Sequence, residues 1–530
     1  MKKFLATHVI IIVDIMIASS IFPQRPIRSL RASYAAASSS ESGSSSHGSM
    51  GLRRGDSLQG RGVLARAMEI VRAEPRAPRP SASVMLRRGE QILVCHRTSG
   101  VPAFPDYWAF PGGGVSRVDR NPLFALFREM IEEVGLTPKL THIDAHLRQE
   151  IVQDKSAFNR MIEQGQIELN ESAFQIISER TTPPFGPLRF HNHFFSAKCD
   201  VDPILEQGER VEFDAFRWAT PAQLLEEWMR HEIKIPPPII MLLRELVGKE
   251  MEQAVHDLSL NPPSENVRIE FAPGVECIPI PTDTLPPATH TNCYILGVPG
   301  GDRVIIDPAA KSDEGIRILT EKVNDILQSG SQIVATIFTH LHPDHIGDLK
   351  AISNLYTAPI WATEETHSTI PPCDTDSVLK EGDSFDLDDV TWTVIETPGH
   401  CPGQICLVSE AGIISADNVV QVGTILVPSG EGDMTAYIAG LKRLRKMDAN
   451  LLFPGHGPVV TNPSKLLTHY ITHREKRHSS VLEAVNRGLT SIEEIADAAY
   501  ADTPEAHPLL KLDQTQAHLD ALRKEGKLKG

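Results

Sequence analysis

The sequence has few of the features that mark secreted, membrane or fibrous proteins. Its 530 residues include only seven cysteines and no CxxC pair, so neither a disulfide framework nor a cysteine-rich zinc knuckle is expected, and the thiols suit a reducing compartment. Lysine and arginine number 52 against 68 acidic residues, a net charge of −16, which argues against a chain-wide electrostatic grip on nucleic acid or anionic lipid. The length predicts roughly three or four ordinary globular domains.

The single long apolar run, residues 4–22, is a poor membrane span because His8 and Asp14 interrupt it. Three interpretations stay open: a secretory signal, an organellar targeting peptide, and an extension upstream of a start at Met50. Asp14 argues against the first, and a Ser/Ala-rich continuation favours the second. Residues 1–80 are predicted to be a disordered or targeting extension, and the protein to be cytoplasmic or in an organelle lumen, with no stable membrane partner.

Ordered patterns begin at Ala82. Residues 83–86 and 91–95 predict two strands of a hairpin. Apolar residues then recur at helical spacing from Pro122 to Val134, and Gly135 is a good helix stop. Further helices are expected within residues 140–174 and 221–246, with a strand around residues 193–197.

The second half of the chain alternates buried strands with helical patterns, which indicates layered α/β packing with functional groups at the strand ends. The strands are expected at residues 304–307, 333–338 and 413–417. A small helical module follows, with Thr490 and Glu493 as a capping box. The predicted domains are residues 81–250, 265–478 and 479–530.

The most specific motif is the run from Thr339 to His345, THLHPDH, directly after an apolar strand. Three imidazoles and a carboxylate within six residues have no ordinary use in a protein core, whereas metal sites demand this clustering of ligand types. Two divalent cations held close together lower the pKa of a bound water, so that a hydroxide nucleophile exists near neutral pH.

This motif resembles the metallo-beta-lactamase superfamily, and TPGH at 397–400, SAD at 415–417 and FPGHG at 453–457 follow in that superfamily's order. The resemblance implies an αββα sandwich with two Zn²⁺ ions, although manganese, iron, or a single iron as in the persulfide dioxygenase branch stay open. It makes Asp307 a structural aspartate and Asp344 a catalytic carboxylate. The implied ligands are His340, His342 and His400 for one metal, Asp344, His345 and His456 for the other, and Asp417 for both.

Residues 430–437 and 470–477 are similar to the lactamase-like endoribonuclease branch of that superfamily, which has an appended winged helix. Single-stranded RNA is therefore a candidate partner by resemblance. A basic cluster at residues 473–478 is equally consistent with RNA contact and with a solvated helix face.

Near the start of the ordered chain, FPGGG at 110–114 and REMIEEVGL at 128–136 resemble the Nudix box, GX5EX7REUXEEXGU, where U is aliphatic. The resemblance implies an α/β/α sandwich that hydrolyses a nucleoside-diphosphate derivative, a small-molecule nucleotide substrate. Glu129, Glu132 and Glu133 are spaced i, i+3, i+4, so their carboxylates share a helix face and can hold Mg²⁺ or Mn²⁺. Residues 180–190 are similar to the coenzyme A diphosphatase-type branch.

The same register places Arg120 where the Nudix family has glutamate, which removes the usual partner of Arg128. Asp119 is a candidate substitute, and Glu209 or Glu212 could supply a further metal carboxylate. The sequence thus predicts a bifunctional metal-dependent hydrolase, whose C-terminal site hydrolyses a phosphodiester such as RNA, an ester or a thioester. Two alternatives stay open: a Nudix domain that only senses a nucleotide and regulates the hydrolase, and a glyoxalase II-like thioesterase. The oligomeric state is not predicted.

Overall fold

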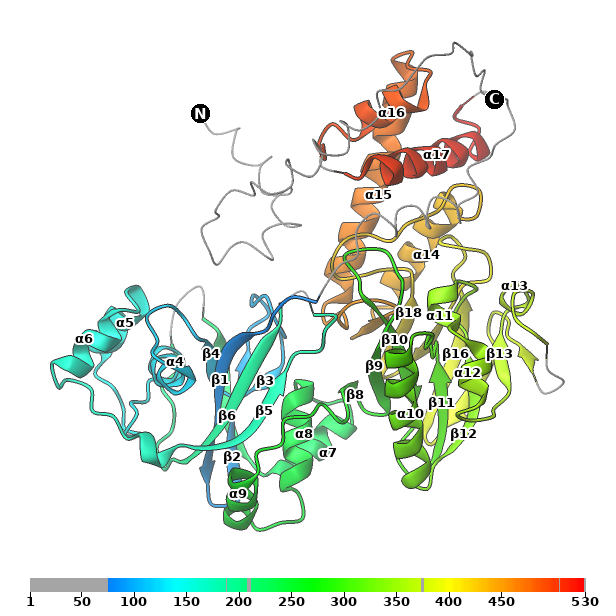
Figure 1. Ribbon diagram of the computed structural model, residues 1–530. Coiled ribbons are helices and arrows are strands. Elements are labelled where there is room, and N and C mark those ends of the chain that lie inside the picture. Colours follow the sequence, from blue (N-terminus) through cyan, green and yellow to red (C-terminus); the bar gives the residue numbers. More distant parts are fainter. Residues whose placement is uncertain (1–74, 187, 207–210, 373–375, 505, 529–530) are drawn as a thin grey trace, which may run out of the picture. The chain divides into compact units, whose positions relative to one another are not determined.

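The computed structural model describes residues 75–528 apart from 187, 207–210, 373–375 and 505 (Figure 1). The predicted extension at residues 1–80 lies almost wholly outside the described residues, as do Met50 and Glu209. None of the described helices is both long enough and apolar enough to cross a bilayer.

The first domain is built on a mixed sheet whose central strand is β1 (Arg79–Arg88). The predicted hairpin is confirmed: β1 pairs antiparallel with β2 (Gln91–Arg97), with Arg88 opposite Gln91. On its other side β1 runs parallel to β6 (Phe190–Lys198). The sheet has the order β3-β2-β1-β6-β5, with β4 on β1 and β7 on β2; the remaining bounds are β3 Trp108–Ala109, β4 Gly112–Gly114, β5 Gln175–Thr181 and β7 Phe213–Ala219.

The predicted helix at residues 122–134 is confirmed in extent, but its last turn is wider than expected. α4 (Pro122–Glu129) starts with the Asn121 side chain accepting from the Phe124 amide, and it passes into the π-helical turn η1 (Met130–Val134). Gly135 ends the turn at φ 67°, a left-handed conformation that glycine adopts easily. The other helices of this domain are α5 Ala145–Gln153, α6 Ala157–Glu163, α7 Pro221–Met229, α8 Pro237–Leu246 and α9 Met251–Leu260.

The first domain extends further than the predicted boundary at residue 250. α9 buries Met251, Ala254, Val255 and Leu258 in the same apolar core as β1 and β2. A helix that buries its apolar face in a hydrophobic core belongs to the domain built around that core. Figure 1 shows α8 and α9 beside the strands of this sheet.

The second domain packs two sheets face to face, as the predicted αββα sandwich requires. Trp392 and Val394 of one sheet share a core with Val304 and Ile306 of the other. α10 (Asp313–Gln328) covers the first sheet, while α14 (Met434–Lys446) covers the second. The sheet orders are β14-β13-β12-β11-β10-β9-β8 and β15-β16-β17-β18-β19.

The strands of these two sheets have the following bounds: β8 Glu270–Ala272, β9 Val275–Pro281, β10 His290–Leu296, β11 Asp302–Ile306, β12 Gln332–Ile337, β13 Ile360–Ala362, β14 Ser377–Val378, β15 Ser384–Leu387, β16 Val390–Glu396, β17 Ile405–Ser409, β18 Gly412–Ala416 and β19 Leu452–Pro454. The short helices between them are α11 Pro343–Ile346, α12 Leu349–Ser353 and α13 Glu364–His367. The three buried strands predicted in this half are β11, β12 and β18.

The C-terminal module consists of α15 (Pro463–Asn486), α16 (Ile492–Ala499) and α17 (Pro508–Lys524). The capping box of α16 is formed by Ser491 and Glu494, so the prediction of Thr490 and Glu493 was one residue too early. No strand is assigned after Pro454 in the described part of the chain. The described residues of this module therefore form helices without a β-wing, and the winged helix stays a prediction.

Two arginines of the predicted basic cluster are buried rather than solvated. Arg477 stacks its guanidinium 3.9 Å from the Tyr500 ring and binds Asp502 at 2.9 Å. Arg474 donates to the Gln514 side chain at 2.9 Å. Both side chains connect the C-terminal helices to their surroundings, so they are not free to contact a nucleic acid.

Replacing the fully buried Leu522 of α17 by alanine is expected to destabilise the C-terminal module by about 2–5 kcal/mol, because the change leaves a cavity between α15, α16 and α17. Leu260, which is 72% exposed, is the matched control, and its alanine variant should behave like the parent. Urea-dependent pulse proteolysis, followed as loss of the C-terminal helices, measures the difference. Equal stability of the two variants would contradict the packing described.

Candidate metal centre and acidic helix

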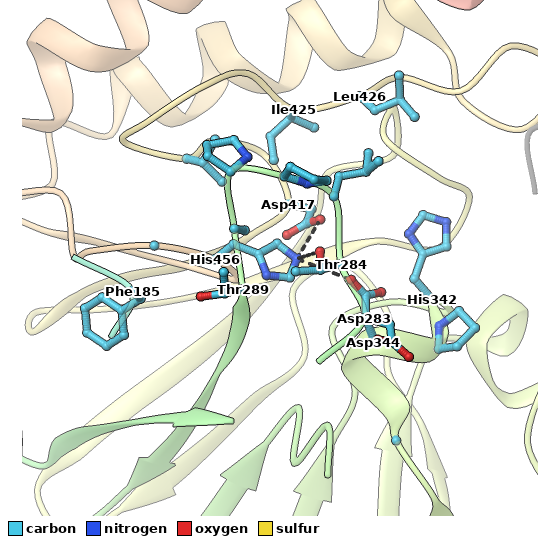
Figure 2. A pocket seen from close by; sticks show the side chains of 18 of the residues that line it. Phe185, Asp283, Thr284, Thr289, His342, Asp344, Asp417, Ile425, Leu426 and His456 are labelled. Carbon is cyan, nitrogen blue, oxygen red and sulfur yellow. Dashed lines mark hydrogen bonds and ion pairs between the residues drawn. The ribbon is translucent and has the colours of Figure 1, made fainter. Parts of the chain in front are cut away.

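The predicted ligands of the second domain come together although they lie on four separate segments of the chain. His340 and His342 follow β12, and His345 lies in α11. His400 follows β16, Asp417 comes directly after β18, and His456 comes shortly after β19, at the same end of the sandwich. Figure 2 shows the side chains of Asp344, Asp417 and His456 pointing toward one another in the pocket.

The first ligand group consists of His340, His342 and His400, whose ligand atoms lie within 4.8 Å of one another. His342 Nδ1 is 2.9 Å from His400 Nε2. The His340 ring lies 4.8 Å from the His342 ring and 5.3 Å from the His400 ring. This arrangement places three imidazole nitrogens around one point, as the sequence predicted.

The second group consists of Asp344, His345 and His456. His456 Nε2 is 3.3 Å from His345 Nε2 and 3.5 Å from Asp344 Oδ2. Asp417 connects the two groups, because its carboxylate oxygens lie 3.5 Å from His345 Nε2, 3.5 Å from His456 Nε2 and 3.6 Å from His400 Nε2. A carboxylate in this position can contribute one oxygen to each of two cations.

Each of the five imidazoles has its other ring nitrogen held by a partner outside the two groups. Such contacts fix the ring orientation and the tautomer of metal-binding histidines. The partners are the Thr339 hydroxyl for His340 at 3.0 Å, Glu431 for His342 at 3.3 Å, Asp307 for His345 at 2.8 Å, the Leu426 carbonyl for His400 at 2.6 Å and the His290 carbonyl for His456 at 2.9 Å.

Asp307 has the most connections among these partners. It lies directly after β11 at φ 46°, a strained backbone conformation for a residue with a side chain. Its carboxylate accepts from the Thr339 amide at 2.8 Å and the Thr339 hydroxyl at 2.6 Å, and it contacts His345 Nδ1. Asp307 therefore positions both the start of the ligand loop and one of its ligands, which agrees with the predicted structural role.

Two buried atoms in this cluster have no hydrogen-bond partner, namely His340 Nε2 and Asp417 Oδ1. A buried polar atom without a partner costs free energy, so its presence calls for a ligand that the chain itself does not supply. Neutral imidazole and ionised carboxylate form the donor set of zinc and of other divalent first-row metals. The residues present therefore fit a pair of metal ions.

The electrostatics of the cluster differ from one ligand to the next: they favour the neutral form of His340 and His400 and the ionised form of Asp417, whereas they favour the protonated form of His345. Burial and the neighbouring imidazole of His345 hold the pKa of His340 well below its usual value, and burial lowers the pKa of His400 to about 4. For His345 the burial effect is outweighed by Asp307 and Asp417, which raise its pKa to about 9. The surrounding imidazoles overcome burial at Asp417 and hold its pKa well below the usual range.

Sequence reasoning missed Cys401. The motifs pointed to imidazole and carboxylate ligands with no thiolate, but the Cys401 sulfur lies within 4.8 Å of the ligand atoms of His340, His342 and His400. Burial raises the pKa of this thiol well above its ordinary value, so it is present as a neutral thiol. Its position beside His400 in the chain was the only available signal.

A pocket of about 1110 Å³ opens over the ligand cluster, and His342, Asp344, His400, Asp417 and His456 all line it. Most of its other wall residues in this domain are apolar, and Ile425 and Leu426 are labelled in Figure 2. The leucine, isoleucine and valine side chains that line the pocket are Leu285, Leu341, Ile346, Leu349, Ile370, Val420, Val422, Ile425 and Leu426.

In the first domain, the Nudix-like helix is organised around Arg128, whose side chain is fully buried. Its guanidinium binds both oxygens of Asp119, at 3.0 and 2.9 Å. Asp119 thus replaces the missing family glutamate, as the sequence suggested. Arg120 instead places its guanidinium 5.0 Å from the Phe124 ring.

Glu129, Glu132 and Glu133, the three predicted metal carboxylates, lie on one helix but have different partners. Arg128 lies between two of them, 2.8 Å from Glu129 and 2.9 Å from Glu132. Glu133 accepts from the Gly112 amide at 2.9 Å, and burial together with Glu212 raises its pKa well above the usual value. Glu212 forms an ion pair with Arg97.

Replacing Asp119 by alanine is expected to destabilise the α4–η1 region by about 3–5 kcal/mol, because the fully buried Arg128 loses its bidentate partner. Hydrogen exchange of the α4 amides measures this loss. Arg120→Ala is the control, since Arg120 is exposed and its ring contact is worth less than about 1 kcal/mol. Similar exchange rates in the two variants would show that Asp119 does not support the helix.

Two family models match this chain. The Metallo-beta-lactamase superfamily model matches residues 286–456, and the NUDIX domain model matches residues 77–237. A beta-lactamase-like protein 2 homolog of Drosophila melanogaster is 28% identical over 254 residues, which cover 45% of this chain and 84% of that protein.

Solved structures give two further likenesses. A metallo-beta-lactamase family protein from Thermus thermophilus is 20% identical, with a TM-score of 0.40, covering 48% of this chain and 95% of that one. A NUDIX hydrolase from Alicyclobacillus acidocaldarius is 22% identical, with a TM-score of 0.32, covering 35% and 99%. By the two family matches, the chain carries an N-terminal NUDIX domain and a metallo-beta-lactamase superfamily domain, and it is a hydrolase.

Proposed function

We propose that the metallo-beta-lactamase domain hydrolyses an acyl ester or thioester at a dinuclear zinc centre. The observation that carries this proposal is the convergence of seven ligand side chains, with Asp417 between the two groups, in a pocket whose remaining wall is mostly apolar. Two zinc ions held there would supply a hydroxide near neutral pH and an electrophile for the scissile carbonyl oxygen.

The chain's own residues prepare this reaction by orientation. Asp307, Glu431 and the Leu426 carbonyl fix the rings of His345, His342 and His400 before any substrate arrives. The Asp344 carboxylate lines the pocket, where it is placed to accept or hold a proton next to the reacting group.

The apolar part of the wall suits an acyl chain. Leu341, Ile346 and Leu349 lie on one segment of the wall, and Val420 and Ile425 on another. Burial of such surface contributes about 25 cal/mol per Å², so an apolar acyl group gains binding free energy there while a phosphate does not. RNA as a substrate stays a prediction from the endoribonuclease-like motifs.

The zinc-loaded full-length protein is expected to hydrolyse acyl thioesters faster than single-stranded RNA. Asp417→Asn should lower turnover about 100-fold or more, because it removes the carboxylate between the two metal positions. Asp325→Asn, an exposed change on α10, is the control with parental activity. Turnover on RNA alone would contradict the acyl substrate, and unchanged turnover in Asp417→Asn would contradict the dinuclear centre.

For the NUDIX domain we propose hydrolysis of a nucleoside-diphosphate derivative with Mg²⁺ or Mn²⁺, which would make the chain bifunctional. The supporting observation is that the Arg128 network survives the loss of the family glutamate through Asp119, while Glu129, Glu132 and Glu133 are retained. These carboxylates would hold the cation against the diphosphate. Mg²⁺ would compete with Arg128 for Glu129 and Glu132.

The alternative is that the NUDIX domain only senses a nucleotide, and Arg120 motivates it. A double variant separates nucleotide sensing from diphosphatase catalysis. Glu132→Gln combined with Glu133→Gln is expected to abolish diphosphatase turnover, because two of the three metal carboxylates lose their charge. Glu163→Gln, exposed at the end of α6, should leave turnover unchanged. Unchanged diphosphatase turnover in the double variant, with altered activity of the metallo-beta-lactamase domain, would instead support a regulatory NUDIX domain.

A further inference from the structure

A third cluster of metal-ligand side chains lies on the NUDIX sheet and shares no residue with either site described above. Glu179 belongs to β5, and His191 and His193 belong to β6. One ligand atom of each lies within 4.8 Å of the other two, and all three residues are partly exposed. We propose that these residues bind a divalent transition metal ion, with zinc as the expected occupant.

The strand pairing explains why the three side chains meet. His191 and His193 are two residues apart on β6 and therefore point to the same face of the sheet. Glu179 is directly opposite His193 in the antiparallel β5–β6 ladder, and Thr181 is opposite His191. Directly opposite residues have Cβ atoms about 4.5–5.5 Å apart. The register of β5 and β6 thus places the Glu179 carboxylate beside the two imidazoles.

The hydrogen bonds of the two rings are compatible with Nε2 of each ring binding a metal. His193 Nδ1 lies 3.2 Å from the Ser81 carbonyl. A carbonyl only accepts, so Nδ1 donates and Nε2 keeps its lone pair. His191 Nε2 faces the Glu179 carboxylate, which only accepts, so Nε2 carries the proton in this structure and a metal ion would replace that proton. The Thr181 hydroxyl, 2.9 Å from His191 Nδ1, can accept as well as donate and so permits the tautomer that a metal ion needs. Metal-binding histidines usually have such a partner on the second nitrogen.

The distances also suit a shared cation. Glu179 Oε2 is 3.1 Å from His191 Nε2, and two ligands of a tetrahedral zinc ion with bonds of about 2.0–2.1 Å lie about 3.3 Å apart. An ordinary cross-strand ion pair would explain this contact alone. It would not explain the second imidazole, whose ring stands at 87° to the His191 ring with the centroids 4.7 Å apart. Two histidines and one carboxylate are the protein ligands of open zinc sites.

The scaffold around Glu179 is fixed independently of any metal. The Glu179 amide donates to the Pro263 carbonyl at 3.0 Å, and the Asn266 side chain donates to the Thr181 carbonyl at 2.6 Å. These contacts hold the outer edge of β5. Because the backbone positions are set in advance, metal binding has to order only three side chains, which lowers its entropic cost.

The test is zinc stoichiometry of the full-length protein after dialysis against a fixed concentration of free zinc. We expect the His193→Gln variant to contain one zinc ion per chain fewer than the parent. Glu179→Gln, a conservative change at a partly exposed position, should lose the same ion and serves if His193→Gln fails to fold. His256→Gln is the matched control, since His256 is exposed on α9, and it should retain the parental content.

Anomalous diffraction at the zinc edge locates the ion directly. A peak between His191 and His193 is expected in the parent crystal and should be absent in the Glu179→Gln crystal. Equal zinc content in the parent and both variants, without a peak at this place, would overturn the proposal. Zinc at His340 and His456 gives separate peaks, so failure of the dinuclear centre and failure of this site are distinguishable.

Discussion

The carboxylate of Asp307 is the constraint on which the metallo-beta-lactamase site depends. It ends β11 in a strained conformation and binds the amide and hydroxyl of Thr339, so the end of one strand determines where the loop after the next strand begins. It also orients His345. His400, Asp417 and His456 follow strand ends of the second sheet, so the packing of the two sheets brings both halves of the site together.

In the NUDIX domain, the corresponding constraint is the buried charge of Arg128. Arg128 is buried among acidic side chains, which is tolerable only because Asp119, Glu129 and Glu132 all bind it. The replacement of the family glutamate by Arg120 therefore did not leave a buried charge unpaired. Asp119 makes the contact with Arg128 instead, and the exposed Arg120 places its guanidinium over the Phe124 ring.

Local sequence patterns predicted many of the helices and strands, because these elements depend on interactions between residues that are close in the chain. The hairpin of β1 and β2, the helix ending at Gly135 and the buried strands β11, β12 and β18 all follow from periodicity and stop signals. Sequence patterns did not predict three features: the π turn after Glu129, the extension of the first core to α9, and the exact position of the capping box of α16. The extension of the first core to α9 depends on packing between residues distant in the chain, whereas the capping box of Ser491 and Glu494 is itself a local pattern that was assigned one residue too early.

The sequence by itself determined which side chains are available for chemistry: three histidines and an aspartate in one loop, their partners near residues 400, 417 and 456, and the acidic helix. Only the tertiary structure decided the arrangement. It placed Cys401 beside the imidazoles, buried Arg474 and Arg477 instead of exposing a basic face, and brought Glu179 opposite His193. The reason is that strand register and sheet packing act between residues far apart in the chain, where no local pattern records the contact.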